Sequence, residues 1–258
     1  MGQTITFMNN KGGCGKTTTV CAVGEHWALL GKKILLIDLD SQASLTSIVT
    51  DTDGDQEWDR TIENAFIDGP DVPLPIVHVK ENLDIIPADL ELSDFNDSTA
   101  SQKMREWMLA DLLATVKDQY DFILIDCPPA LGLIAYNALV AADWLIIVTN
   151  AEGTSYRGVK MIMKLYNDVR SNARLNPYLN FLGVVVTRFE KNNISNKYWE
   201  LLKDAFKIYL IEPPIRKSTK LVQAASFQTS IFDLDPKGRA TEDYVEVAEE
   251  LIKRALLP

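Results

Sequence analysis

The strongest chemical signal in the sequence is a glycine-rich segment, Lys11-Gly12-Gly13-Cys14-Gly15-Lys16-Thr17-Thr18. It lies between an apolar run and a helical pattern, which is the context of a phosphate-binding loop. Glycines let the backbone turn tightly and direct N–H groups at phosphate oxygens, and the helix N-terminus adds partial positive charge. We therefore expect this loop to bind nucleotide phosphates.

Three side chains of the loop have distinct expected roles. Lys16 would reach the β- and γ-phosphates, the Thr17 hydroxyl would ligate Mg²⁺, and Thr18 would meet the α-phosphate. ATP and Mg²⁺ are the expected ligands. The alternative, an ordinary glycine-rich turn beside lysines, does not explain why strand, spacing, Lys-Thr pair and helix all agree.

Acidic side chains close two apolar runs further along the chain. Asp38 ends the run 34–38 and is followed by Asp40, and Asp126 ends the run 121–126. A carboxylate buried at a strand end is costly without a cation or strong hydrogen bonds, which favours a metal ligand at Asp126. The Asp38/Asp40 pair could instead cap the following helix.

The elements that must position these residues alternate between strand and helix. Strands are expected at 4–9, 34–38, 83–87, 121–126, 144–150 and 181–187, and helices at about 16–30, 101–118, 132–141, 155–172, 194–207 and 240–256. Continuous apolar runs separated by helices predict an α/β fold, doubly wound, with a mainly parallel sheet and helices on both faces. Such sheets bind ligands beyond the carboxyl ends of their strands.

Composition fits one globular unit. The 258 residues are 47% hydrophobic and 24% charged, and three cysteines without zinc-ligand spacing fit a reduced, cytoplasmic protein. We expect a single domain over 1–258 with an irregular acidic insertion at about 50–80 around one short helix at 61–67. No apolar run reaches the 18 residues of a membrane span.

Charge is unevenly distributed. The net charge is −10, yet residues 51–100 hold 14 acidic and 2 basic residues, whereas residues 188–220 hold 8 basic and 4 acidic ones. Local potential matters more for binding than the total, so a polyanionic partner at the basic segment is compatible with an acidic protein.

Lys11, which precedes the glycine pair, makes the loop resemble the deviant Walker A motif, KGGxGK[ST], of the ParA/MinD family of ATPases. Asp38-Leu39-Asp40-Ser41-Gln42-Ala43 is similar to the family's switch I segment, and Ile125-Asp126-Cys127-Pro128-Pro129 resembles its Walker B strand and switch II. The resemblance runs along almost the whole chain.

The resemblance implies a mechanism and its residues. Two subunits would sandwich two nucleotides, and Lys11 would cross to the partner's phosphates. Asp40 would position the attacking water, Asp126 would hold Mg²⁺, and Asp38 would support the metal and its loop. The expected activity is a slow ATP hydrolysis that a partner protein stimulates.

The stretches 128–152 and 217–254 look like ParA and Soj, the DNA-partitioning branch of the family. This implies a homodimer with ATP, binding to nonspecific DNA, a ParB-like stimulating protein, and a cytoplasmic, nucleoid-associated location. Lys220 lies where the register places a DNA-contacting arginine, and Lys217 is the next candidate. The adenine candidates are Arg188, Pro214 and Arg216.

Two other functions of the same kind of ATPase stay open. A MinD-like protein would bind membrane through a C-terminal amphipathic helix, but residues 244–258 are too acidic for that, and no membrane is expected. A nucleotide-gated scaffold that positions a protein assembly is the other alternative.

Overall fold

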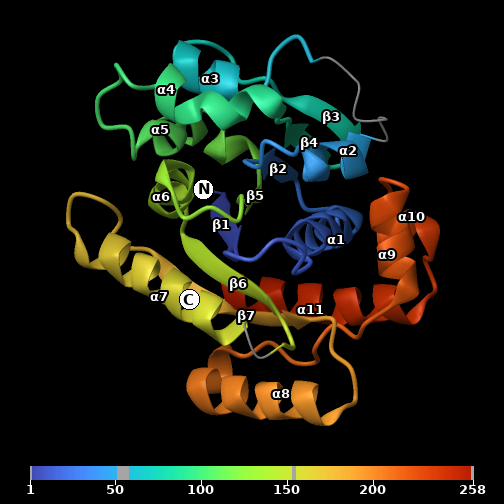
Figure 1. Cartoon of the computed structure of the whole chain (residues 1–258). Coiled ribbons are helices and arrows are strands. Elements are labelled where there is room, and N and C mark those ends of the chain that lie inside the picture. Colours follow the sequence, from blue (N-terminus) through green and yellow to red (C-terminus); the bar gives the residue numbers. More distant parts are fainter. Residues whose placement is uncertain (1, 51–57, 153–154, 257–258) are drawn as a thin grey trace.

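The computed structural model describes residues 2–50, 58–152 and 155–256 (Figure 1). The sheet has seven strands in these ranges, in the order β3-β4-β2-β5-β1-β6-β7. Their bounds are β1 (Gln3–Met8), β2 (Ile34–Asp38), β3 (Val77–Lys80), β4 (Leu83–Ile86), β5 (Phe122–Asp126), β6 (Trp144–Asn150) and β7 (Asn180–Thr187). Only β3 is antiparallel to its neighbour.

The central strands are buried on both faces, as their continuous apolar sequences predict. Every residue of β2 and β5 is buried. Strand β3 was not expected, because its residues alternate between half-buried and exposed, which is the pattern of an edge strand. The six strands that the sequence predicts are all present.

Helices cover both faces of the sheet (Figure 1). One apolar cluster packs α1, α2, α9, α10 and α11 on one face. The other cluster packs α3, α5, α6, α7 and α8 on the opposite face, with the short α4. The bounds are α1 (Lys16–Leu29), α2 (Ser44–Thr50), α3 (Ile62–Asp68), α4 (Phe95–Ser98), α5 (Met108–Ala114), α6 (Leu133–Ala141), α7 (Ser155–Ser171), α8 (Asn193–Phe206), α9 (Thr219–Ser226), α10 (Ile231–Leu234) and α11 (Arg239–Ala255). The doubly wound α/β fold is confirmed.

The predicted helix at 101–118 is wrong over most of its length. Regular helix is confined to α5, and a 3₁₀ turn, η2 (Lys117–Gln119), follows it. Residues before α5 form turns, with Met104 at a positive φ of 52°. The side chain of Asn137 on α6 accepts a hydrogen bond from the backbone N–H of Leu109 at 3.0 Å and so satisfies the helix start there.

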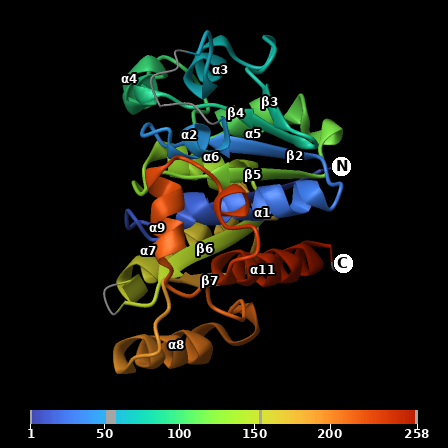
Figure 2. The ribbon, with the colours of Figure 1, turned by 90° about the vertical axis from the view of Figure 1, so that its right-hand side faces the viewer.

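The acidic insertion predicted at about 50–80 lies partly outside the described residues, because 51–57 are not among them. Its remainder contains α3, which a capping box of Thr61 and Asn64 begins, and the edge strand β3. Figure 2 shows this region at one end of the sheet and α8 at the other.

No helix in the described ranges is long and apolar enough to cross a membrane. The last helix, α11, packs against α1 through residues such as Val247, Ala248 and Leu251, which are fully buried. Its apolar face is therefore part of the core.

Candidate nucleotide-binding site

The glycine-rich loop leaves the central strand β1 and enters α1 at Lys16. Gly13 and Gly15 have φ angles of 70° and 87°, which side-chain-bearing residues rarely adopt. The loop borders a hollow of about 470 Å³. Its lining comprises residues 11–18 together with Asp40, Gln42, Ser44, Ser47, Ile48, Pro129, Arg188, Ala225 and Gln228. All eight predicted loop residues thus face one hollow.

Lys16, Thr17 and Asp126 form a buried cluster beside the loop. Lys16 Nζ donates to Asp126 Oδ1 at 2.8 Å, and Thr17 Oγ1 donates to Asp126 Oδ2 at 2.6 Å. Burial alone would lower the pKa of Lys16, but the charge and hydrogen bond of Asp126 outweigh it and raise that pKa. The loop cation and the strand-end acid therefore neutralise one another.

Asp38 and Asp40 occupy different environments. Asp38 stands directly opposite Asp126 in the β2–β5 register and is fully buried. Its Oδ2 accepts hydrogen bonds from the backbone N–H and the hydroxyl of Thr46, each at 2.9 Å. Burial, reinforced by the charge of Asp126, raises the pKa of the Asp38 carboxyl. Asp40 instead is half-buried and faces the hollow.

Lys11 lies at the rim of the hollow and is held within its own subunit. Its Nζ lies 2.6 Å from a carboxylate oxygen of Glu152, which follows β6. The preceding residue, Asn10, donates its side-chain amide to Met161 Sδ at 3.3 Å, and its Oδ1 lies where a side chain on Gly158 would be. The loop is thereby docked on α7.

The three residues predicted to contact adenine lie in different surroundings in the structure. Arg188 lines the hollow, at a φ of 53°. Pro214 lines a second hollow with Phe189, Trp199, Glu212 and Pro213. Arg216 is bound to the buried carboxylate of Asp243 through its backbone N–H and its guanidinium. Neither Pro214 nor Arg216 is among the described residues that line the loop's hollow, so their adenine role stays a prediction.

The two DNA candidates flank the start of α9. Lys217 is exposed and pairs with Glu190, at 2.6 Å between Nζ and Oε1. Lys220 is exposed and takes part in no ion pair with another described residue. The structure thus leaves Lys220 the freer of the two.

Comparison with known proteins gives a consistent relationship. Residues 2–181 match a family model, AAA_31, described as an AAA domain. The sporulation initiation inhibitor protein Soj of Bacillus subtilis is 34% identical over 97% of this chain and 98% of its own length. The chromosome-partitioning ATPase Soj of Treponema pallidum is 32% identical over 98% of each chain.

The chain belongs to the ParA/Soj family of ATPases. A solved structure with the same fold is cobyrinic acid a,c-diamide synthase of Mycobacterium smegmatis with bound ATP analogue and magnesium. Its TM-score is 0.86, with 26% identity over 99% of this chain and 96% of that one. The P-loop class of the fold, expected from the motif, is confirmed.

Sequence reasoning missed one residue that shapes the site of this ParA/Soj-family ATPase. Thr187, at the end of β7, is 2% exposed and donates its hydroxyl to the Cys14 carbonyl at 2.5 Å, with the Thr149 carbonyl at 3.4 Å. It therefore fixes the middle of the loop from a strand far away in the sequence. The available signal was its position at the carboxyl end of a predicted strand.

The cysteines near the loop are poor candidates for redox chemistry. Burial raises the pKa of Cys14, and it raises the pKa of Cys127 to about 12. Both are therefore protonated thiols at neutral pH, and the thiolate is the reactive form.

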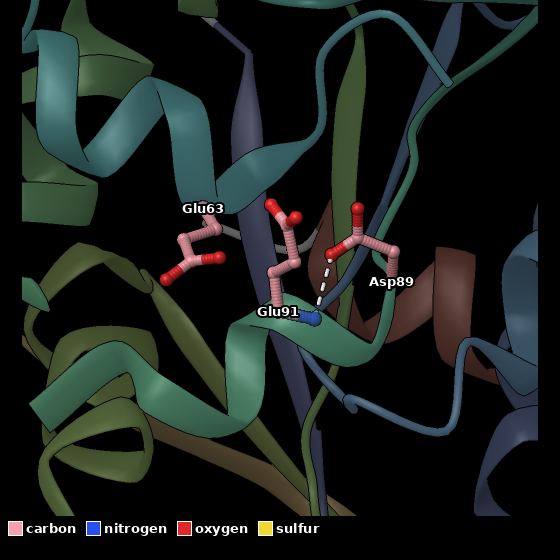
Figure 3. A group of neighbouring side chains, drawn as sticks. All are labelled: Glu63, Asp89 and Glu91. Atoms are coloured by element: carbon pink, nitrogen blue, oxygen red, sulfur yellow. Dashed lines mark hydrogen bonds between the residues drawn. The ribbon is translucent and has the colours of Figure 1, made fainter. Parts of the chain in front are cut away.

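A second group of acids lies away from the loop (Figure 3). Carboxylate oxygens of Glu63, Asp89 and Glu91 lie within 4.8 Å of one another. Asp89 also accepts a hydrogen bond from the backbone N–H of Glu91 at 3.1 Å. Burial and the neighbouring acids raise the pKa of Glu63. None of the three lines the loop's hollow.

Proposed function

We propose that this protein is an ATP-dependent dimerisation switch that acts in chromosome or plasmid partitioning. In this scheme, a Mg²⁺-ATP sandwich dimer binds nonspecific DNA, and a ParB-type partner stimulates its hydrolysis. The observation that carries the proposal is the arrangement around one hollow: the phosphate loop, Asp40 and the rim residue Lys11 all face it. The partitioning role is inferred from the relatives.

The residues present fit a magnesium nucleotide. Extra atoms on Gly12 and Gly13 would meet nothing within 4 Å, so phosphate oxygens can approach that backbone closely. The ammonium group of Lys16 would move from Asp126 to the β- and γ-phosphates. The Thr17 hydroxyl and the Asp126 carboxylate, which lie 2.6 Å apart, are the groups that would hold Mg²⁺.

Asp40 is the proposed water-positioning acid. Its Oδ1 accepts the backbone N–H of Gln42 at 3.1 Å, which holds the side chain on the loop that borders the hollow. Asp40 is the one carboxylate among the described residues that line the hollow, and it is half-buried, which suits slow hydrolysis. A stimulating partner would improve the alignment of this loop.

Lys11 supports the sandwich arrangement. In the single subunit its charge is taken by Glu152, and both side chains are partly exposed, at 39% and 54%. The lysine can therefore exchange this contact for a phosphate of a facing subunit at little cost.

DNA binding is assigned to the basic residues at the start of α9. Lys220 and Lys217 would contact phosphates without reading sequence. A cytoplasmic, nucleoid-associated location and a ParB-like partner follow from the same proposal.

The test uses Asp40→Ala, which should accumulate as the ATP-bound dimer. With Mg²⁺-ATP it should retain plasmid DNA of any sequence, and binding should weaken steeply as salt rises, because released counterions drive it. Lys16→Ala, which should lose the nucleotide, is the control and should bind no more DNA with ATP than without.

Anionic liposomes in the same assay test the two alternative functions, membrane binding and the positioning of a protein assembly. ATP-dependent binding to liposomes but not to DNA would overturn the proposal in favour of a membrane ATPase. Binding to neither would favour a scaffold for a protein assembly.

A further inference from the structure

The outer face of α7 carries a row of hydrogen-bond donors. Its exposed residues at alternating spacings of three and four are Arg157, Lys160, Lys164, Asn167 and Ser171, here called the α7 stripe. Residues at this spacing lie on one side of a helix, and 14 residues span about 21 Å. The opposite side is buried, with Val159, Ile162 and Val169 in the core.

The three cations of the stripe are not neutralised within the described part of the chain. Arg157, Lys160 and Lys164 form no ion pair there, whereas Lys11, Lys203 and Lys217 each have an acidic partner. Lys160 lies over the Tyr156 ring, 4.6 Å from its centroid, and remains exposed.

Few acids adjoin the stripe. The neighbouring elements α6 and β6 contain no aspartate or glutamate. On α7 itself, Asp168 is the one acid, and Glu152 before the helix is bound to Lys11. In a protein of net charge −10, this is a locally positive surface.

We infer that the α7 stripe is a second contact surface for the phosphate backbone of DNA, separate from Lys217 and Lys220. Arginine, lysine, asparagine and serine are among the side chains that contact DNA phosphates, and such contacts carry no sequence information. Protein interfaces are instead centred on apolar anchors and are poor in lysine. The exposed apolar residue of α7, Met161, lies at the flank of the stripe and contacts Asn10.

The two surfaces lie on opposite faces of the sheet. Helix α7 packs in the apolar cluster of one face, and Ala224 of α9 packs in that of the other (Figure 1). Each subunit would thus offer two surfaces that contact phosphates, and the losses in DNA affinity should add when both surfaces are removed. This inference rests on the proposed DNA binding.

The experiment compares two triple variants in the Asp40→Ala protein with Mg²⁺-ATP. The stripe variant is Arg157→Gln, Lys160→Gln and Lys164→Gln, since glutamine keeps helix propensity. The control is Lys33→Gln, Lys103→Gln and Lys237→Gln, which removes the same charge from three scattered exposed lysines that form no described ion pair. A fluorescent 30-base-pair duplex is titrated by anisotropy at several salt concentrations.

The stripe variant should bind the duplex at least about tenfold more weakly, with a shallower salt dependence, while the control changes binding about threefold or less. Thermal melting and ATP-dependent dimerisation should match the parent in both. Equal losses in the two variants would show a net-charge effect only and overturn the inference, as would a stripe variant that binds like the parent.

A wrong proposed function would give a different result from a wrong inference. The parent dimer itself would then bind no duplex, and the inference would fail as well. A binding titration with poly-L-glutamate in place of DNA completes the experiment. If it binds the parent as tightly as DNA does, and only through the stripe, the surface belongs to an acidic protein and the DNA assignment is overturned.

Discussion

Single side chains in this ATPase are constrained most strongly around Asp126. Asp126 is fully buried and is satisfied by one ammonium and one hydroxyl. Loss of Lys16 would leave a buried charge unpaired, and loss of Thr17 would remove one of its hydrogen bonds. Lys11, at the rim, has no such constraint. The two lysines of the loop should therefore fail in different ways.

Lys16→Ala should lose nucleotide binding, and Lys11→Ala should keep binding but lose ATP-dependent dimerisation. The first change removes the cation that would meet the phosphates. The second removes a contact that would be made across subunits. A fluorescent ATP analogue measures binding, and light scattering measures dimers. A Lys11→Ala protein that dimerises as well as the parent would exclude the sandwich role of this lysine.

Asp40→Ala should bind Mg²⁺-ATP yet hydrolyse it about 10²–10⁴ times more slowly, the usual cost of losing a catalytic acid or base. The side chain faces the hollow and accepts one hydrogen bond, so its loss should disturb the fold little. Phosphate release from excess ATP measures the rate. Turnover close to that of the parent would move the role to another acid.

Much of the site was predictable at this scale because P-loop chemistry depends on local sequence. Residues 11–18 and the strand-end acids are each fixed by the turn or strand that carries them. Pro214 and Arg216 were harder to place, because long-range contacts decide where they lie: Asp243, on α11, holds Arg216. Thr187 was missed because its partner, the Cys14 carbonyl, lies 173 residues away.

Strand β7 holds the phosphate loop through one hydroxyl, and Thr187→Val tests this link. Valine keeps the shape but leaves the buried Cys14 carbonyl without its donor, which costs about 1–3 kcal/mol. Both the stability of the Thr187→Val protein and its affinity for ATP should be lower than those of the parent. Thr241→Val is the matched control, since Thr241 is 3% exposed, donates to the Asp235 carbonyl at 2.6 Å and does not line the hollow. It should lower stability alone; an equal loss of ATP affinity in both variants would refute the link.

Helix α1 ends against α10 and α11 through a histidine that resists protonation. Burial lowers the pKa of His26 despite Glu249, whose carboxylate is 3.9 Å from Nε2, and the ring stacks on Phe232. Below about pH 6.5 the unfolded chain binds a proton there more readily than the native state does. The stability that the neutral ring provides is therefore lost as pH falls.

His26→Phe should remove this pH dependence. The variant keeps an aromatic ring against Phe232 but has no titrating nitrogen. Its melting temperature relative to the parent should rise as pH falls from 7.5 to 5.5, by several degrees at most. Melting curves at both pH values measure the difference, and a gain that is the same at each would contradict the assignment.

At the element scale, apolar runs predicted the parallel strands well, because these strands are buried on both faces and need no partner to be recognised. The edge strand β3 and the short helices α9 and α10 have no comparable pattern. Of the helix expected at 101–118, only α5 forms. The side chain of Asn137, on another helix, determines where it begins by accepting a hydrogen bond from the backbone N–H of Leu109. Tertiary contacts therefore set the boundaries that sequence periodicity could not.

At the scale of the whole molecule, charge is unevenly distributed. The acidic segment around β3 and α3 lies at one end of the sheet, whereas α7, with four basic residues and one acid, lies away from that end (Figure 2). An acidic total charge is thus compatible with a polyanionic ligand, provided that the ligand approaches the basic surfaces on α7 and at the start of α9 and not the acidic end. At more than a Debye length, about 8 Å at physiological salt, the acidic end contributes little.

Assembly of two subunits should depend on how readily Lys11 leaves Glu152. Glu152→Gln removes the acid that holds this lysine within its own subunit, so in the Asp40→Ala protein less ATP should be needed for half-maximal dimerisation. Exposed ion pairs contribute about 0.2–1 kcal/mol, which corresponds to a shift of up to about fivefold. Glu190→Gln is the matched control: it removes the same charge from an ion pair of the same 2.6 Å length, with Lys217, outside the hollow. Light scattering during an ATP titration measures both variants. If Glu152→Gln shifts the midpoint no more than Glu190→Gln does, or raises it, the Lys11–Glu152 pair does not restrain dimerisation.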